Sequence, residues 1–115
     1  MDVAAFEARF TGRDAMLTEV FTDAELAYCR RQPTPWPHLA ARFAAKEAVL
    51  KALTSGLAGA MRWQDIEVTR DPAGTPGLAI AGATADALRR EGLAASSISL
   101  SHTATHAVAV VLLTP

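Results

Sequence analysis

Four charged side chains lie close together in one short segment, and their types and spacing could bind a metal ion beside a phosphorylated ligand. The segment 42–53 is otherwise made mostly of residues that favour a helix. Arg42 and Lys46 are one helical turn apart, and so are Glu47 and Lys51. A carboxylate can ligate a hard cation such as Mg²⁺, and ammonium or guanidinium groups bind phosphate oxygens. Taken alone, the spacing favours a plainer interpretation, a solvated helix face with a Glu47–Lys51 ion pair worth about 0.2–0.5 kcal/mol.

Four further motifs follow this helix in a fixed order. They are W-x-D-I-E-V at 63–68, G-x-P at 74–76, S-x-S-H at 99–102 and an apolar run at 107–113. Together with R-F-A-A-K-E-A on the helix, the set closely resembles the holo-acyl-carrier-protein synthase family, the small 4′-phosphopantetheinyl transferases. One such motif would be weak support, whereas five in order are strong support for the family.

The resemblance implies the 4′-phosphopantetheinyl transferase fold and a magnesium-dependent transfer reaction. Such enzymes move 4′-phosphopantetheine from coenzyme A to a serine of an acyl-carrier protein and release adenosine 3′,5′-bisphosphate. By this resemblance Glu47 is the helix-borne magnesium ligand. Lys51, one turn on, would contact the diphosphate and stabilise or protonate the leaving phosphate. Both residues are therefore expected to be catalytic.

Further residues are expected, on the same resemblance, to bind coenzyme A or the carrier protein. Arg42 and Lys46 would meet the carrier protein or the phosphates of the nucleotide, with Arg42 exposed to solvent. His102 would contact a coenzyme A phosphate, and the loop with Gly74 and Pro76 would lie close to the adenine nucleotide. Two plainer interpretations stay open. The loop could be only a hairpin turn, and His102 could be a surface histidine that caps the turn after it.

The N-terminal residues depart from the family pattern. The family begins with a strand of the form G-x-D-x-x-E, whose aspartate is a second metal ligand. Counting back from 21–22 places Asp2 at the later acidic position, so that the ligand aspartate would lie before Met1. If the intervening segment were a few residues shorter than usual, Asp2 would itself be the metal ligand. Three explanations stay open: a start codon placed too late, recruitment of Asp2, or a homologue with a lost or changed reaction.

A homologue without transfer activity is therefore the competing hypothesis. It would bind a carrier protein or coenzyme A without transfer, or act on a carrier-bound acyl chain. Loss of one carboxylate from a two-carboxylate magnesium site should weaken metal binding, because water does not replace its charge. The residues do not indicate whether the carrier protein serves fatty-acid or polyketide synthesis.

Length and composition fit one cytoplasmic domain, residues 1–115, and no membrane or nucleic-acid partner. Half of the 115 residues are hydrophobic and the net charge is −1, so a general polyanion-binding surface is not indicated. The longest uncharged apolar run, 107–113, is far shorter than the roughly 20 residues of a membrane helix. The first residues show no basic and then apolar pattern typical of secretion. Cys29 alone excludes an internal disulfide and a cysteine-built metal site, and we expect it to pack within a helix.

The chain is predicted to fold as α+β, with one long helix lying on a small, mainly antiparallel sheet. A capping box of Thr22 and Glu25 marks one helix start. Gly56 is a plausible end of the long helix that carries the charged motif. The prolines of the segment 32–37 indicate an extended connector between these two helices. The predicted helices span 22–31, 38–54 and 84–91.

Strands are predicted in the second half of the chain. They span 63–69, 77–80, 97–101 and 106–113. The last one is apolar enough to be buried on both faces. The segment 2–10 could be a strand end or a helix start. Asp65 and Glu67 are expected to be exposed strand residues, and His38 and His106 to be structural or exposed.

Proteins that resemble this family at this length are trimers, and we expect a homotrimer here. Each site would lie between the helix of one subunit and the sheet of its neighbour. A nearly charge-free last strand beside a serine-rich strand leaves more apolar surface than one small sheet and one long helix easily cover. A cyclic trimer would bury this surface and would place His102 across the interface from Glu47 and Lys51.

Overall fold

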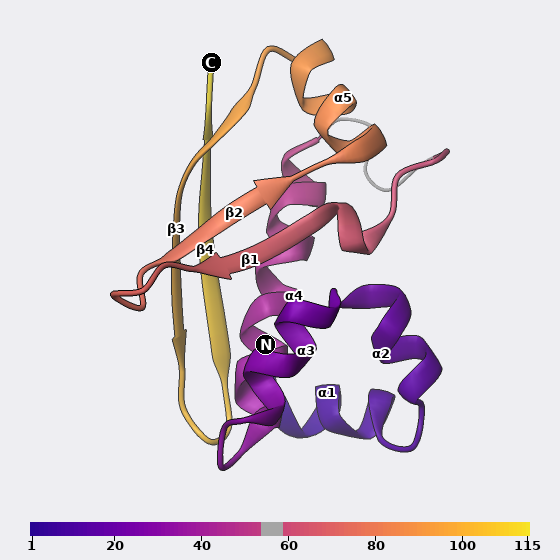
Figure 1. Ribbon diagram of the computed structural model, residues 1–115, viewed down its shortest axis with the longest axis vertical. Helices are drawn as coiled ribbons and strands as arrows, with labels where there is room; N and C mark the ends of the chain where they lie inside the picture. Colours follow the sequence, from indigo (N-terminus) through magenta and orange to yellow (C-terminus); the bar gives the residue numbers. More distant parts are fainter. Residues whose placement is uncertain (54–58) are drawn as a thin grey trace.

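The computed structural model describes residues 1–53 and 59–115, which hold five α-helices and four strands. Three short helices lie together at one end, a long helix runs along the molecule, and two hairpins lie beside it (Figure 1). The helices are α1 (Val3–Phe10), α2 (Asp14–Val20), α3 (Asp23–Arg30), α4 (Pro35–Ala52) and α5 (Gly82–Arg90). The predicted α+β class is confirmed. None of these described helices is both long and apolar enough to cross a membrane.

Helix α3 begins where its capping box predicts. The backbone N–H of Glu25 donates to Thr22 Oγ1 at 3.2 Å, and the N–H of Thr22 donates to Glu25 Oε1 at 2.9 Å. These two bonds satisfy donors that have no partner within the helix itself. The sequence does not predict α2, which lacks a side-chain cap at Arg13.

Helix α4 begins earlier than predicted, because its prolines open the helix. The expected extended connector at 32–37 is wrong in its second half, since Pro35 is the first residue of α4. Proline is well suited to the first turn, where its missing N–H would have no helical partner. The helix ends at Ala52, and the predicted end at Gly56 lies outside the described residues.

The N-terminal segment combines both predicted possibilities. Asp2 Oδ1 accepts a hydrogen bond from the N–H of Ala5 at 2.9 Å and so caps α1. Asp2 also forms an isolated antiparallel bridge with His106, and the N–H of Ala107 donates to Met1 O at 2.9 Å. The start of the chain is thereby held beside the last strand, and α1 leads directly away from it.

The strands form two antiparallel hairpins in the described part of the chain. The first pairs β1 (Ile66–Arg70) with β2 (Pro76–Ile80), and the second pairs β3 (Ala94–His102) with β4 (Ala107–Thr114). A 3₁₀ turn, η1 (Trp63–Asp65), occupies the first part of the predicted strand 63–69.

Within one subunit the last strand is covered on one face only, so its predicted burial on both faces is not achieved by this chain alone. Val108, Val110 and Leu112 are 55 %, 62 % and 52 % exposed. We call these three residues the β4 stripe. Their cross-strand partners are Ser101, Ser99 and Ser97. Alternate residues, including Val111 and Leu113, pack into the core beside α4, because α4 lies on only one face of this hairpin.

Two apolar clusters lie along α4. The first joins α4 to α1–α3 and includes Phe6, Phe10, Phe21 and Phe43. The second lies beneath the later part of α4 and includes Val49, Leu50, Ile66 and Leu88. Cys29 is fully buried in the first cluster, as predicted. Burial raises the pKa of its thiol to about 11, so the thiol is protonated at neutral pH.

The two acidic residues near β1 are tied into the fold. Asp65 is buried, not exposed as predicted, because its Oδ2 accepts from Thr84 Oγ1 and from the N–H of Arg62, both at 3.1 Å. Glu67 is half-buried, and its Oε2 accepts from the hydroxyl of Thr22 at 2.5 Å.

Candidate functional site

The four charged residues of α4 differ in exposure. Arg42 and Lys46 are 1 % and 0 % exposed, Glu47 is half-buried and Lys51 is exposed. The predicted exposure of Arg42 is therefore wrong. Within the described chain, Glu47 and Lys51 form no ion pair with each other or with any other residue. Their carboxylate and ammonium groups remain available to a ligand.

Asp2 and Glu47, the two predicted metal ligands, line one pocket of about 210 Å³. Asp2 lies at the start of α1 and Glu47 in the second half of α4, and packing of α1 on α4 brings them to the same place. We call this the Asp2–Glu47 pocket. Its other lining residues are Met1, Ala5, Phe6, Arg9 and Phe43.

The two carboxylates suit a magnesium ion. The N–H of Ala5 orients the Asp2 carboxylate through Oδ1, and Glu47 accepts no hydrogen bond from any described residue. Magnesium usually takes one or two carboxylates and completes its shell with substrate oxygens and water. Over 1–53 and 59–115 no group of three or more His, Cys, Asp or Glu side chains could hold a metal. Two carboxylates lining one pocket are within the number that a magnesium site usually takes from a protein.

Arg9 lines the same pocket, and no sequence motif indicates it. Its Cζ atom lies 5.5 Å from the ring centroid of Phe10 and 5.6 Å from that of Phe43. Arg9 follows Asp2 by two helical turns, so both project on one side of α1. That spacing is the sequence signal that could have found it.

A second pocket, of about 320 Å³, contains buried Arg42 together with Arg31 and Arg70. We call it the arginine pocket. The Cζ atoms of Arg42 and Arg70 lie 4.4 Å and 5.2 Å from the ring centroid of Tyr28. Arg42 Nη1 donates to His38 O at 3.1 Å, whereas Arg42 Nε is buried without a partner among the described residues. No carboxylate in that part of the chain forms an ion pair with Arg42. A buried cation in this state favours an anion in the pocket.

The arginine pocket adjoins other predicted coenzyme A contacts. The ring of His102 lies 4.4 Å from the ring of His38, between centroids. Arg70 Nη1 donates to Gly74 O at 2.6 Å, which ties the G-x-P loop to the same region. The fold thus gathers Arg42, His102 and the loop, which are far apart in sequence. Sequence reasoning misses Tyr28 and Arg70, because no motif marks them.

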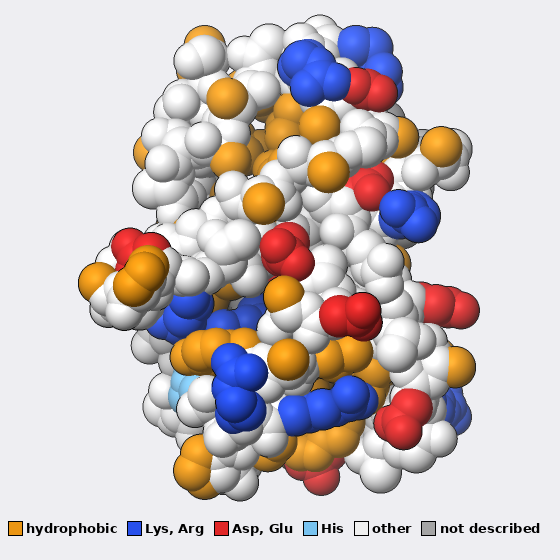
Figure 2. Space-filling model, viewed as in Figure 1, with side chains coloured by type: hydrophobic (Ala, Val, Ile, Leu, Met, Phe, Trp, Pro, Cys, Tyr) orange, Lys and Arg blue, Asp and Glu red, His pale blue; other side chains and the backbone are white. Residues whose placement is uncertain are grey.

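The pKa of His38 depends on both its burial and the positive charge around it. Burial lowers the pKa of His38 below its usual value, and the neighbouring charges of His102, Arg42 and Arg70 lower it further. His38 is therefore neutral at pH 7. In the view of Figure 2, several Lys and Arg side chains lie in the lower half of the molecule, over α3 and the start of α4, with acidic side chains among them. The region suits a negatively charged ligand.

The two plainer interpretations have different outcomes. Thr103 Oγ1 accepts from the N–H of Thr105 at 3.2 Å, so a threonine and not His102 caps this turn. The loop with Gly74 does form a hairpin turn, in which the N–H of Gly74 donates to Asp71 O at 2.8 Å, and this geometry is compatible with a nucleotide contact as well. The φ of 87° at Gly74 is a conformation that glycine adopts without strain. Pro76 begins β2 directly after this turn.

Lys46 uses its ammonium group inside the fold. Its Nζ lies 2.8 Å from Glu25 Oε1 and donates to Trp63 O at 3.2 Å and to Ile66 O. An ammonium group has three N–H donors, and these three acceptors use them all. The predicted contact of Lys46 with a phosphate or the carrier protein therefore has no donor left in this conformation.

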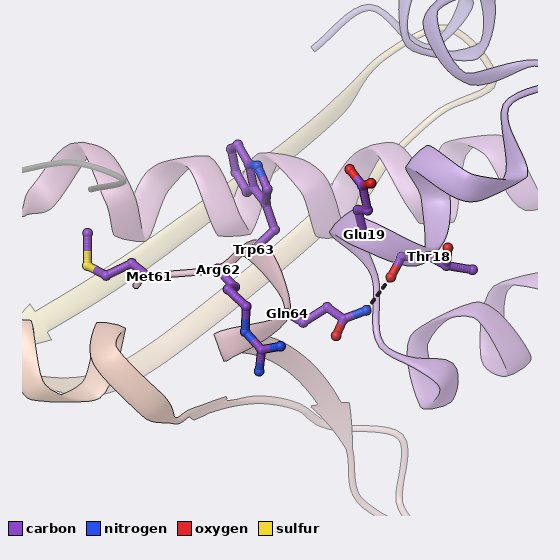
Figure 3. Close-up of a pocket in the computed structure, with 6 residues that line it drawn as sticks. All are labelled: Thr18, Glu19, Met61, Arg62, Trp63 and Gln64. Carbon is purple, nitrogen blue, oxygen red and sulfur yellow. Dashed lines mark hydrogen bonds between the residues drawn. The ribbon is translucent and has the colours of Figure 1, made fainter. Parts of the chain in front are cut away.

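A third pocket, of about 420 Å³, lies between α2 and the residues around η1 (Figure 3). Gln64 Nε2 donates to Thr18 O across one side of it. The ring centroid of Trp63 lies 5.0 Å from that of Phe43, which also lines the Asp2–Glu47 pocket. The lining residues are Thr18, Glu19, Met61, Arg62, Trp63 and Gln64, none of which the sequence predicts as a site residue.

Known proteins resemble this chain over nearly its whole length. Residues 1–111 match the family model described as the 4′-phosphopantetheinyl transferase superfamily. The chain is 42 % identical over 112 residues to the holo-[acyl-carrier-protein] synthase of Moorella thermoacetica, covering 97 % of this chain and 87 % of the relative. Its identity to the holo-[acyl-carrier-protein] synthase of Geobacter sp. strain M21 is 41 % over 114 residues, with coverage of 98 % and 91 %.

A solved structure extends the comparison to three dimensions. The holo-(acyl-carrier-protein) synthase of Bacillus anthracis, in complex with CoA (3′,5′-ADP), superposes with a TM-score of 0.76 at 27 % identity. The match covers 98 % of this chain and 89 % of that one. The family motifs, the fold and these matches agree, and the chain belongs to the holo-acyl-carrier-protein synthase family within the 4′-phosphopantetheinyl transferase superfamily.

Proposed function

We propose that this protein transfers 4′-phosphopantetheine from coenzyme A to a serine of an acyl-carrier protein, with Mg²⁺ as the metal ion. The observation that carries the proposal is that Asp2 and Glu47 line one pocket, and neither forms an ion pair with a described residue. The holo-[acyl-carrier-protein] synthase relatives and the solved relative with coenzyme A support the substrate pair. The shared pocket supports Asp2 as the second ligand.

The reaction is a displacement at phosphorus. The serine oxygen bonds to the phosphorus that carries the pantetheine arm and its proton passes to solvent, while the bond to the bridging oxygen breaks and adenosine 3′,5′-bisphosphate leaves. Asp2 and Glu47 would hold the magnesium ion, which supplies positive charge beside the diphosphate when bound. Lys51, exposed one turn beyond Glu47, would bind the diphosphate and stabilise or protonate the leaving phosphate.

We assign the arginine pocket to the phosphates of the nucleotide. The buried guanidinium of Arg42 forms no ion pair with a described residue, and Glu67, which also lines the pocket, is engaged by a hydroxyl group. A phosphate oxygen would satisfy the free Nε donor and the charge together. His102 and the loop with Gly74 and Pro76, which adjoin this pocket, would complete the coenzyme A contacts.

We further propose a homotrimer in a cytoplasmic setting. The β4 stripe and its serine partners form an uncharged surface on one face of the last hairpin. A cyclic assembly would cover it and would place His102 of one subunit opposite Glu47 and Lys51 of the next. Sedimentation analysis tests this assembly, and a stable, fully active monomer would rule it out.

One assay tests the transfer reaction directly. Apo acyl-carrier protein, coenzyme A and magnesium are incubated with the protein, and the carrier is weighed by mass spectrometry. We expect a phosphopantetheine adduct, which is lost when a chelator removes the metal ion. Coenzyme A binding without an adduct on fatty-acid or polyketide carriers would instead support a homologue that binds these partners without transfer.

A further inference from the structure

Glu25 and Lys46 form an ion pair that is completely hidden from solvent. Both side chains are 0 % exposed, and Lys46 Nζ lies 2.8 Å from Glu25 Oε1. Both charged groups are withdrawn from water, which is costly unless they are paired and hydrogen-bonded. Such a pair contributes little stability compared with two apolar residues of similar volume. Its presence therefore calls for a reason other than stability.

The pair connects four elements through directional bonds. Glu25 Oε1 accepts from the N–H of Thr22, and Glu25 Oε2 accepts from the N–H of Val68 in β1 at 2.9 Å. Lys46 on α4 donates to the carbonyl oxygens of Trp63 in η1 and of Ile66 at the start of β1. Helix α3, helix α4, η1 and β1 thus share one network in which both partners are fully hydrogen-bonded. Hydrophobic contacts are non-directional, whereas these hydrogen bonds fix the rotation of α4 about its axis and its position along that axis.

Glu47 is the next residue on the same helix. Successive helical side chains project about 100° apart, so a helix fixed in rotation at Lys46 is fixed at Glu47 as well. Lys46 faces inward to β1, and Glu47 lines the pocket shared with Asp2. Trp63, whose carbonyl accepts from Lys46, also packs its ring against Phe43 in the wall of that pocket.

We propose that Glu25 and Lys46 are positioning residues for the metal ligand Glu47. Their buried bonds hold α4 at the rotation that directs the Glu47 carboxylate into the Asp2–Glu47 pocket. This inference rests on the proposed magnesium site, and it gives Lys46 a function different from phosphate contact. Neither residue touches substrate in this assignment, so both act through Glu47.

The test separates positioning from simple stability. We would compare the wild type with the double variant Glu25→Gln/Lys46→Met, which keeps the volume and removes both buried charges. The matched control is Val49→Ala, which removes buried methyl groups from α4 one turn away without touching the pair. Mn²⁺ binding is measured by the enhancement of water proton relaxation, and the free energy of unfolding by urea titration.

The double variant should bind Mn²⁺ about tenfold more weakly, the usual effect of losing a group that orients a metal ligand. Val49→Ala should bind Mn²⁺ like the wild type even if it unfolds more easily. The single variant Lys46→Met should be the least stable, because it leaves Glu25 buried without its partner.

Two kinds of outcome would overturn the inference in distinguishable ways. If Glu47→Gln loses Mn²⁺ binding but the double variant binds like the wild type, the magnesium site stands and the pair has no positioning role. The positioning role is equally excluded if Val49→Ala weakens Mn²⁺ binding as much as the double variant does. If the wild type binds no Mn²⁺, with or without coenzyme A, the proposed metal site fails and the inference fails with it.

Discussion

The Asp2–Glu47 pocket and the arginine pocket both lie against α4, and they differ in the sign of the charge that predominates. Arg9 also lines the first pocket and Glu67 the second. The first brings together two carboxylates that form no ion pair with a described residue, on a half-exposed surface. The second contains a buried guanidinium that has no counterion in the described chain and a free N–H donor. Cation and anion are the two components that a magnesium-bound diphosphate ligand would supply. Neither pocket contains residues of the other, which is consistent with a site completed by a neighbouring subunit.

The largest effect is expected in the Asp2–Glu47 pocket. Glu47→Gln should abolish transfer while leaving the unfolding midpoint unchanged, because the substitution removes a ligand charge without creating a cavity. Turnover is measured against magnesium concentration with a saturating carrier protein. Wild-type turnover at low magnesium would show that Glu47 is not a ligand.

Asp2→Asn should weaken the apparent magnesium affinity by at least the roughly 10- to 100-fold that loss of an outer-shell partner costs, because it removes the charge of a ligand. Asparagine caps a helix as well as aspartate does, so the start of α1 should keep its stability. Asp2→Ala serves as the comparison, because it should lose about 1 kcal/mol of stability in addition. An unchanged magnesium dependence in Asp2→Asn would return the ligand question to the other two explanations.

Arg42→Met should raise the Kd for coenzyme A by about 10- to 150-fold, because a charge-assisted bond to phosphate is worth about 1.5–3 kcal/mol. The free energy of unfolding should change little, since the substitution replaces a buried, unpaired cation by an apolar side chain. Calorimetric titration and urea unfolding provide the two measurements. A higher KM for the carrier protein with unchanged coenzyme A binding would move Arg42 to the carrier interface.

Mixing two variant subunits tests whether Glu47 and His102 of different subunits form one site. Glu47→Gln and His102→Ala subunits, each inactive alone, should regain a fraction of wild-type activity when unfolded and refolded together. A mixed interface can carry a native Glu47 from one subunit and a native His102 from the other. Mixed trimers without any regained activity would place both residues in the site of a single subunit.

The smallest effect concerns His38. Its folded-state pKa lies below the usual 6.5, so its contribution to stability is present above that pH and is lost as the pH falls through the folded pKa. His38→Phe keeps an aromatic ring beside His102 and removes this proton, so stability should fall slightly less between pH 7.5 and pH 5. Urea unfolding at both pH values measures the difference, and an unchanged difference would exclude His38 as its source.

Local signals predict the parts of this molecule that depend on local bonds. The capping box at Thr22 and Glu25 forms as expected, and the hairpin turn at Gly74 does too. The charged motif lies on α4, as its helical spacing indicates. Family resemblance offers Asp2 as a partner of Glu47 only if the segment after it is shorter than usual, and the fold brings both residues to one pocket.

Tertiary packing determines the burial of the residues that local sequence patterns predict wrongly. Arg42 and Lys46 have the spacing of a solvated helix face, yet α3 and β1 cover both. Asp65 alternates like an exposed strand residue, but the hydroxyl of Thr84 in α5 makes it an internal acceptor. The last strand is as apolar as a doubly buried one, and only the placement of α4 shows that one face is left open.

That open face has a consequence for how the protein behaves on dilution. If the β4 stripe is covered only by other copies of the chain, folding and assembly share one equilibrium, and the unfolding midpoint rises with protein concentration. Ligands bound between subunits would shift the same equilibrium toward the assembled state. Specific activity measured at nanomolar enzyme would then reflect subunit dissociation as well as catalytic rate, and rate constants are best compared at matched protein concentrations.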